Sequence, residues 1–289
     1  MVQPITSPRN SQVKYLRSLR LRKYRKREGR FLIEGIRIVG EALSSGAPLE
    51  TLVYAPDLLT SERARSLVER AGQARRLVLS GDVFRTLSDR DQPQGVAAVV
   101  RIEDPPLTAI ATSPAASDGA LLVVVAYQLQ DPGNLGSIIR TADAAGATGV
   151  VVVEPSVDLY APQTVRATMG SIFSLPVVRL ADGTALSTWF EEVRAGGVPL
   201  LVVASSTHAQ QVYFEVDLGG PLVLLIGNER QGLPVAVQEN ADVAVHLPMA
   251  GRATSLNASA ATAALIYEAV RQRQTSTPSS SGEAGENPD

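Results

Sequence analysis

In residues 131–149 (DPGNLGSIIRTADAAGATG), two glycines, Gly133 and Gly136, stand at the start of an expected helix that also carries Arg140. Gly133 and Gly136 follow an apolar, strand-like run. Glycines at such a turn often bind a nucleotide, because the bare backbone can approach the ligand and the helix N-terminus offers free N–H groups. Arg140 lies one helical turn beyond Gly136, on nearly the same face. The spacing indicates either a guanidinium that faces a ligand or an ion pair between Arg140 and Asp143.

A dinucleotide site of the dehydrogenase type is one interpretation of this turn. The strand, glycine turn and helix are followed by Glu154 at the end of the next expected strand, where an acid can bind a ribose. However, the glycines are spaced G-x-x-G, whereas the fingerprint needs G-x-G-x-x-G. The same glycines are also compatible with a tight turn that binds nothing.

Two later stretches also place polar side chains after expected strands. Glu229 lies in the glycine turn of LLIGNERQGLP, and Ser255 and Asn257 lie in the loop that enters the last helix. Loops that follow parallel strands emerge at one edge of the sheet, where ligands bind in open α/β folds. The expected constellation of candidate catalytic residues is therefore Asn134, Arg140, Glu229, Ser255 and Asn257.

The composition is that of a globular protein and excludes several kinds of chemistry. Of the 289 residues 45% are hydrophobic and only 4% aromatic, which argues against a stacking platform for single-stranded nucleic acid. Cysteine is absent, so disulfides, thiolate catalysis and cysteine-bound zinc are excluded. With only two histidines, no metal site is expected. No signal peptide or membrane-length apolar run is visible, so we expect a soluble, cytoplasmic protein without a membrane partner.

The net charge of −2 hides a strongly basic N-terminus. Residues 1–30 contain ten Lys or Arg against the single acid Glu28, which gives +9 here and −11 over the rest. A basic arm over residues 1–29 commonly marks an RNA or DNA partner, and a solvated helical face is the alternative. The candidate RNA contacts in this arm are Arg22, Lys23, Arg25, Lys26 and Arg27.

The chain divides into two expected α/β units. A small unit spans 30–102, a Pro-, Ser- and Ala-rich linker spans 103–119, and a disordered tail spans 274–289. In 120–273, continuous β-branched runs alternate with helical stretches, which is typical of a parallel sheet covered by helices. The strands of this larger unit are expected at 121–126, 148–154, 199–205, 221–227 and 241–248, and its helices at about 135–146, 161–170, 183–196, 232–240 and 256–273.

Three short motifs occur in order: NLGSIIRTA (134–142), GNERQGL (227–233) and PMAGRATSLNAS (248–259). They resemble the three motifs of the SpoU (TrmH) family of RNA ribose 2′-O-methyltransferases. Residues 156–177 are similar to the family's segment between the first two motifs, and the likeness covers about 120–273. EGIRIVGEAL (34–43) resembles part of the family's N-terminal domain. One mild departure is Ala258, where many members have valine.

The resemblance implies a methyltransferase domain with a deep C-terminal trefoil knot that binds S-adenosylmethionine, and a homodimer with active sites near its interface. It implies cofactor contacts from Gly227, Leu247 and Leu256. Arg140 would be the central catalytic residue, and the rest of the constellation would orient Arg140 and the ribose. A guanidinium is a poor base, so Arg140 either accepts the hydroxyl proton after desolvation or stays charged and clamps the adjacent RNA phosphate.

The resemblance also implies that 30–102 is an L30e-like RNA-binding domain, and Arg166 is a further candidate RNA contact. The separate α/β N-terminal domain favours 23S ribosomal RNA as the substrate. A tRNA ribose methyltransferase and a non-catalytic RNA-binding protein of the same fold are the alternatives. Antibiotic resistance, as in the avilamycin-resistance methyltransferases, is a further role that overall likeness suggests.

Overall fold

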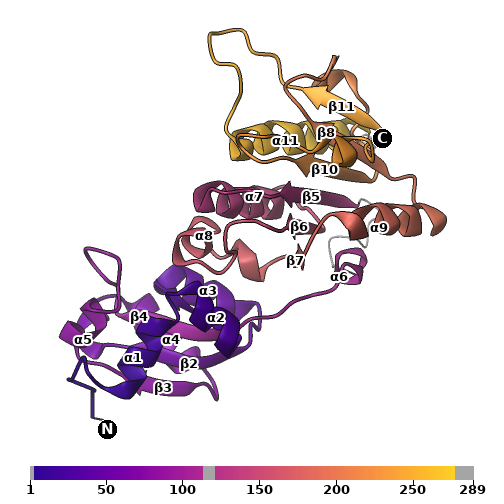
Figure 1. Ribbon diagram of the computed structural model, residues 1–289. Coiled ribbons are helices and arrows are strands. Elements are labelled where there is room, and N and C mark those ends of the chain that lie inside the picture. Colours follow the sequence, from indigo (N-terminus) through magenta and orange to yellow (C-terminus); the bar gives the residue numbers. More distant parts are fainter. Residues whose placement is uncertain (1–2, 113–120, 277–289) are drawn as a thin grey trace, which may run out of the picture.

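The computed structural model describes residues 3–112 and 121–276 and contains two sheets that belong to two domains (Figure 1). The expected linker lies between them. Its residues 103–112 include the short helix α6 (Thr108–Ala111), and its remaining residues lie outside the described ones. Of the expected tail, residues 274–276 belong to the last helix, and 277–289 lie outside the described residues.

The N-terminal domain has a mixed four-stranded sheet with helices on both faces. Its strands are β1 (Arg30–Glu34), β2 (Leu49–Tyr54), β3 (Arg75–Val78) and β4 (Val96–Arg101). Its helices are α1 (Ser11–Ser18), α2 (Arg22–Glu28), α3 (Ile36–Ser44), α4 (Glu62–Arg70) and α5 (Gly81–Arg85), with the 3₁₀ turn η1 (Pro56–Leu58). The order β1-β4-β2-β3 is antiparallel except between β2 and β3. Helices α3 and α4 pack on one face of this sheet, and α1 and α5 on the other.

The basic N-terminal segment is part of this domain and not a separate arm. Val13 and Leu16 of α1 are almost fully buried in the core between α1, α5 and the sheet. Ile5 forms a parallel bridge with Leu79 beside the edge strand. The structure therefore corrects the domain boundary expected at residue 29, because the apolar residues of α1 are spaced to bury one helical face.

The C-terminal sheet is parallel throughout, which confirms the predicted α/β class. Its order is β7-β6-β5-β10-β8-β11-β9, and each neighbouring pair is parallel. The strands are β5 (Leu122–Tyr127), β6 (Gly149–Val153), β7 (Val177–Leu180), β8 (Leu201–Ser205), β9 (Gln211–Val212), β10 (Leu222–Ile226) and β11 (Val243–His246). The helices are α7 (Pro132–Ala144), α8 (Pro162–Ala167), α9 (Thr184–Ala195), α10 (Val235–Gln238) and α11 (Ala258–Ser276), with the turns η3 (Ser171–Phe173) and η4 (Tyr213–Glu215).

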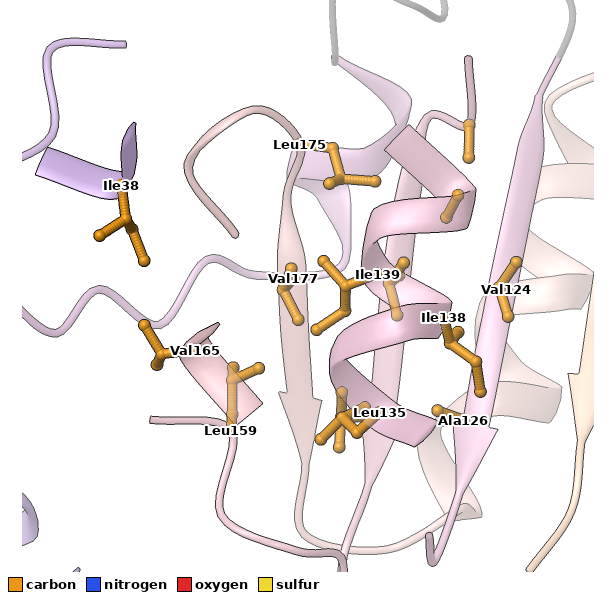
Figure 2. Packing of buried hydrophobic residues seen from close by; sticks show 14 of the residues in the cluster. Ile38, Val124, Ala126, Leu135, Ile138, Ile139, Leu159, Val165, Leu175 and Val177 are labelled. Carbon is orange, nitrogen blue, oxygen red and sulfur yellow. The ribbon is translucent and has the colours of Figure 1, made fainter. Parts of the chain in front are cut away.

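Alternate side chains of the central strand β5 enter two different cores, because successive residues of a strand point to opposite faces. Val124 packs with α7 and α11 on one face, and Val125 packs with α6 and α9 on the other. Figure 2 shows Ile138 and Ile139 of α7 lying over the first face. Burial on both faces explains why the strand sequences are continuously apolar.

The path of the chain across the sheet changes direction between β5 and β10. Strand β5 leads through α7 to β6 on one side, and β10 leads through residues 227–234 and α10 to β11 on the other. Since α7 and α10 pack in different cores, the two connections diverge from neighbouring strand ends. Such a switch point leaves a crevice at the carboxyl ends of the strands, where ligands bind in open parallel sheets.

Strand β7 was not predicted from the sequence, and helices α10 and α11 differ from their predicted bounds. Strand β7 lies in the segment recognised only by its likeness to the family, and it pairs at the edge of the sheet with β6. Helix α10 is shorter than expected, because it begins only after its N-cap residue Pro234 and ends at Gln238. Helix α11 begins at Ala258, two residues later than expected, and continues to Ser276.

Candidate active site

The three motifs are joined by hydrogen bonds at the crevice between β5 and β10. Asn257 Nδ2 donates to Asn134 Oδ1 at 2.6 Å, and Asn134 Nδ2 donates to Glu229 Oε1 at 3.0 Å. Asn134 is only 7% exposed, and these two hydrogen bonds satisfy both the oxygen and the nitrogen of its buried amide. The structure thus brings together one residue from each motif of the expected constellation.

Glu229 also holds the turn between β5 and α7. Its Oε2 accepts the N–H of Gln130 at 3.0 Å, and its Oε1 accepts the N–H of Asp131 at 3.2 Å. Desolvation raises the pKa of Glu229, but the hydrogen bonds from Asn134 and from these backbone groups outweigh it and hold the pKa below its ordinary value. The side chain is therefore a carboxylate at neutral pH that ties the second motif to the first.

Two further residues complete the turn and were missed from the sequence. Asp131 caps α7 by accepting the N–H of Asn134 at 2.8 Å, and Pro132 follows at the first helical position. Asn228 donates to the carbonyl of Gln128 at 2.7 Å and accepts two N–H groups of its own loop. The Asp-Pro pair is a helix-start signal that could have revealed the cap. Residue spacing alone does not point to the contact of Asn228.

Gly133 and Gly136 lie in a helix and not in a loop, because helix α7 begins at Pro132. A Cβ at position 136 would lie 2.5 Å from both the Cβ of Ala167 and the carbonyl oxygen of Thr164. Gly136 therefore allows α8 to approach α7 closely, and the expectation that it cradles a nucleotide is wrong.

A cavity of about 480 Å³ opens beside the cluster, between the second and third motifs. The predicted cofactor contacts Gly227, Leu247 and Leu256 all line it, as does Ser255. A Cβ at position 227 would lie 2.4 Å from the carbonyl carbon of Gly232, so only glycine lets this loop close. The volume lies in the usual range for ligand sites.

His246 also lines this cavity, and it was not singled out from the sequence. Its Nδ1 is buried and has no hydrogen-bond partner among the described residues. Burying a polar atom without a partner is unfavourable by about 1–3 kcal/mol. A polar group of a bound ligand would satisfy it.

Arg140 lies outside the hydrogen-bonded cluster. Its side chain is exposed on α7, and within the described part of the chain it forms no ion pair with Asp143 or any other acid. The guanidinium is thus available for a ligand. Arg166 is half-buried in the last turn of α8, where it lines a small cleft with Arg20 and Asp89 of the N-terminal domain.

The cations of α2 differ in their surroundings. Four are exposed: Arg22, Lys23, Lys26 and Arg27. Arg25 is 4% exposed, and its Nη2 lies 2.5 Å from Asp158 Oδ2 while its Nη1 donates to the carbonyl of Leu19 at 2.9 Å. The expectation that Arg25 contacts RNA is therefore wrong, because its guanidinium is occupied by a buried ion pair.

The described residues offer neither a ligand set for a metal ion nor a membrane span. Across 3–112 and 121–276, no three His, Asp or Glu side chains lie together as the ligands of a metal ion would. In the same residues, no helix has both the length and the apolar character needed to cross a membrane.

Comparison with known proteins agrees with this geometry. Residues 121–267 match the model of the SpoU rRNA Methylase family, and residues 10–98 match the MRM3-like substrate binding domain. The second match begins before α1, as expected if the basic N-terminal segment is part of the folded domain.

Relatives that align over most of this chain include named 23S rRNA methyltransferases. A 23S rRNA (uridine(2479)-2′-O)-methyltransferase from Streptomyces viridochromogenes is 40% identical over 253 residues, which cover 87% of this chain and 86% of the relative. The 23S rRNA (guanosine(2553)-2′-O)-methyltransferase RlmP from Bacillus subtilis is 32% identical, with 92% and 98% covered. The crystal structure of the SpoU methyltransferase AviRb from Streptomyces viridochromogenes with the cofactor AdoMet has a TM-score of 0.82 at 38% identity, with 92% of this chain and 100% of that chain covered. The chain belongs to the SpoU rRNA methylase family.

Proposed function

We propose that this protein transfers the methyl group of S-adenosylmethionine to a ribose 2′-hydroxyl of 23S ribosomal RNA. The observation that carries the proposal is the convergence of Asn134, Glu229 and Asn257 beside a ligand-sized cavity. Relatives that cover most of the chain are named 23S rRNA 2′-O-methyltransferases, one for a uridine and one for a guanosine. Since their bases differ, the proposal specifies the ribose and not the base.

The cavity residues fit S-adenosylmethionine. Leu247 and Leu256 offer apolar contacts, while the backbone at Gly227 and the unpartnered Nδ1 of His246 offer polar ones. A solved SpoU methyltransferase holds this cofactor. When bound, it supplies an electrophilic methyl group. The task of the chain is then to hold the ribose oxygen in line with that methyl, since positioning alone can provide much of the rate.

The residues of the constellation would have different roles in holding the RNA. Asn134, Glu229 and Asn257 form a fixed polar wall, and Ser255 lies at the cavity beside it. A guanidinium is a poor base, and the exposed side chain of Arg140 can reach a phosphate. This favours the hypothesis in which the guanidinium stays charged and clamps the RNA phosphate, and the phosphate or water takes the hydroxyl proton.

The proposal includes the trefoil knot, a homodimer and a cytoplasmic location. Membership of the SpoU family supports a knotted cofactor site. Arg140 has no partner among the described residues, as expected if a second chain or the RNA completes the site. Ribosomal RNA as the substrate supports the cytoplasm as the compartment.

Methyl transfer to purified RNAs tests the proposal directly. Labelled S-adenosylmethionine is incubated with the protein and 23S rRNA, 16S rRNA or tRNA, and the labelled nucleosides are identified. We expect label on a ribose of 23S rRNA. Label in tRNA alone would identify a tRNA methyltransferase, and RNA binding without label would favour a non-catalytic RNA-binding protein. A further role in avilamycin resistance predicts that expression of the protein raises the inhibitory concentration of avilamycin in a sensitive host.

The exposed cations of α2 provide a test of the RNA-binding surface. Lys23 and Lys26 form no ion pair with a described residue, so the variant K23A/K26A should remain folded. For each cation–phosphate interaction that the variant removes, the slope of log affinity against log salt should fall by about 0.7 for single-stranded RNA. Arg25→Ala should instead destabilise the protein by about 3 kcal/mol, because it leaves Asp158 buried without its partner.

These roles are distinguished by measuring RNA affinity by fluorescence anisotropy over a salt series and by recording a melting curve for each variant. A salt slope in K23A/K26A equal to that of the wild type would contradict the assignment of α2 to the RNA surface. A normal melting temperature in Arg25→Ala would contradict its structural role.

A further inference from the structure

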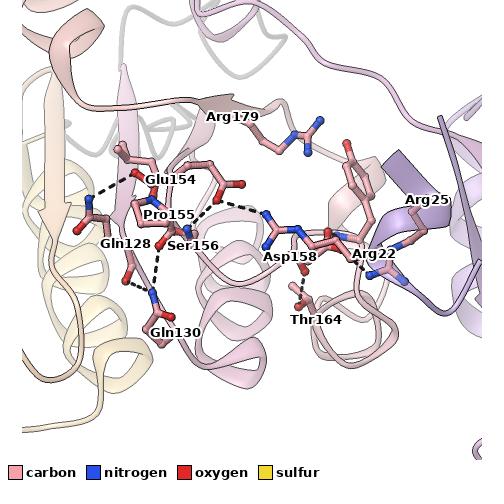
Figure 3. Close-up of polar contacts among 12 residues, drawn as sticks. Arg22, Arg25, Gln128, Gln130, Glu154, Pro155, Ser156, Asp158, Thr164 and Arg179 are labelled. Carbon is pink, nitrogen blue, oxygen red and sulfur yellow. Dashed lines mark hydrogen bonds and ion pairs between the residues drawn. The ribbon is translucent and has the colours of Figure 1, made fainter. Parts of the chain in front are cut away.

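One loop contacts both the N-terminal domain and the catalytic cluster. It spans residues 154–161, between β6 and α8, and is termed the bridging loop. Figure 3 shows Arg22 and Arg25 of α2 on one side of it and Gln128 and Gln130 of the β5–α7 turn on the other. The loop therefore lies between the proposed RNA-binding helix and the proposed active site.

On the side of the N-terminal domain, an exposed ion pair joins Arg22 Nη2 to Glu154 Oε2 at 3.6 Å, and the other contacts are largely buried. The Asp158 side chain is 14% exposed and pairs with Arg25, and its Oδ1 also accepts the N–H of Tyr160 at 3.0 Å. Tyr160 packs against Phe31 of β1, with ring centroids 4.7 Å apart. Its hydroxyl donates to the carbonyl of Glu103 at 2.9 Å. These contacts attach α2 and β1 firmly to the bridging loop.

On the side of the active site, the loop is attached to the turn that Glu229 holds. Gln130 Nε2 donates to the carbonyl of Pro155 at 3.0 Å, and the N–H of Val157 donates to the carbonyl of Leu129 at 2.7 Å. The backbone N–H of the same Gln130 donates to Glu229. Helix α2 is thus connected to Glu229 through one short loop that has side-chain contacts at both ends.

We propose that the bridging loop sets the position of bound RNA relative to the active site, and that Asp158 and Gln130 are positioning residues for methyl transfer. This inference rests on the proposed function. If α2 binds the RNA backbone, its distance from Glu229 determines which ribose reaches the cofactor. Loosening either end of the loop leaves the phosphate contacts and the cofactor cavity in place, but it lets neighbouring riboses compete for the site.

Two substitutions loosen the loop from opposite ends. Asp158→Asn removes the charge that pairs with Arg25, and Gln130→Ala removes the donor to Pro155 while keeping the backbone N–H that Glu229 accepts. Asp82→Asn is the control, because Asp82 also pairs with an arginine, Arg85, but both residues lie on α5, outside the bridging loop.

The experiment measures kcat and KM for 23S rRNA, the cofactor dissociation constant, and the ribose positions that become methylated. For each single variant we expect kcat to fall by about 10-fold, from misplacement of the ribose. KM and cofactor affinity should stay within about 2-fold, and methyl should appear on riboses next to the main target. The double variant should lose little more than the worse single one, because both substitutions release the same loop. Asp82→Asn should behave as the wild type.

The results separate the inference from the function on which it rests. No methyl transfer by the wild type would overturn the proposed function. Transfer by the wild type, with unchanged kcat and unchanged methylation sites in both variants, would overturn the positioning role alone. The positioning role would also be overturned if the fold-loss in kcat of the double variant equalled the product of the two single losses, because the two ends of the loop would then act independently. Melting curves show whether Asp158→Asn is folded, and Gln130→Ala provides a test that leaves the buried ion pair intact.

Discussion

Replacing Arg140 with alanine is expected to lower the rate of methyl transfer to 23S rRNA by about 10³-fold, while cofactor affinity stays within about 2-fold of the wild type. Arg140 does not line the cofactor cavity, and it forms no ion pair within the described residues, so its removal should leave the protein folded and the cavity unchanged. The loss would come from the charge that holds the RNA phosphate when the 2′-oxygen attacks.

Single-turnover methyl transfer and calorimetric titration with S-adenosylmethionine measure the two quantities separately. Arg63→Ala is the matched control, because Arg63 is an exposed arginine on a helix of the other domain. An Arg140→Ala variant with at least a tenth of the wild-type rate would remove Arg140 from the mechanism.

Arg140→Lys distinguishes the two hypotheses for the proton. If the side chain at position 140 accepts the hydroxyl proton, an ammonium group should move the pH–rate profile to lower pH, because it loses its proton more readily than a guanidinium. If it clamps the phosphate, the profile keeps its shape and only the rate falls, because lysine cannot make the bidentate contact.

The parallel sheet could be predicted because its strands are buried on both faces. Residues 121–126 and 221–227 are apolar without alternation, and this pattern has few alternatives in a soluble α/β chain. Helix α1 was missed because its polar and basic residues dominate its composition, although Val13 and Leu16 are spaced for burial. Strand β7 was missed because only half of its short sequence is buried.

The site could be predicted in outline because motif order and sheet topology together place three loops at one edge. Residue types could not show which contacts form. Arg25 and Lys26 are neighbours in a basic run, yet only the tertiary fold places Asp158 against one of them. Gly136 occurs in a motif associated with a ligand, but its hydrogen side chain is needed for packing against α8. Such contacts between distant segments carry no signal in local spacing.

Replacing Glu229 with alanine is expected to reduce methyl transfer by on the order of 10²-fold, through loss of position rather than loss of charge at the reacting atoms. The carboxylate accepts the side-chain amide of Asn134 and the N–H groups of Gln130 and Asp131. Alanine leaves these three donors without their acceptor, and Asn134 is too buried to find water easily. Asn257 depends on Asn134 in turn, so all three motifs lose their alignment.

Glu229→Gln should be less impaired than Glu229→Ala, because an amide oxygen can still accept one of these donors. Glu191→Ala, at an exposed position on α9, should leave the rate unchanged.

The pH dependence of stability provides an independent check on Glu229. Because the folded protein holds the pKa of Glu229 below its ordinary value of 4.5, the stability from this carboxylate is fully present above pH 4.5 and is lost as the pH falls through the lowered value. The difference in unfolding free energy between wild type and Glu229→Gln should therefore be constant at neutral pH and shrink in acid. A difference that stays constant through pH 3 would mean that the charge of Glu229 does not hold the cluster together.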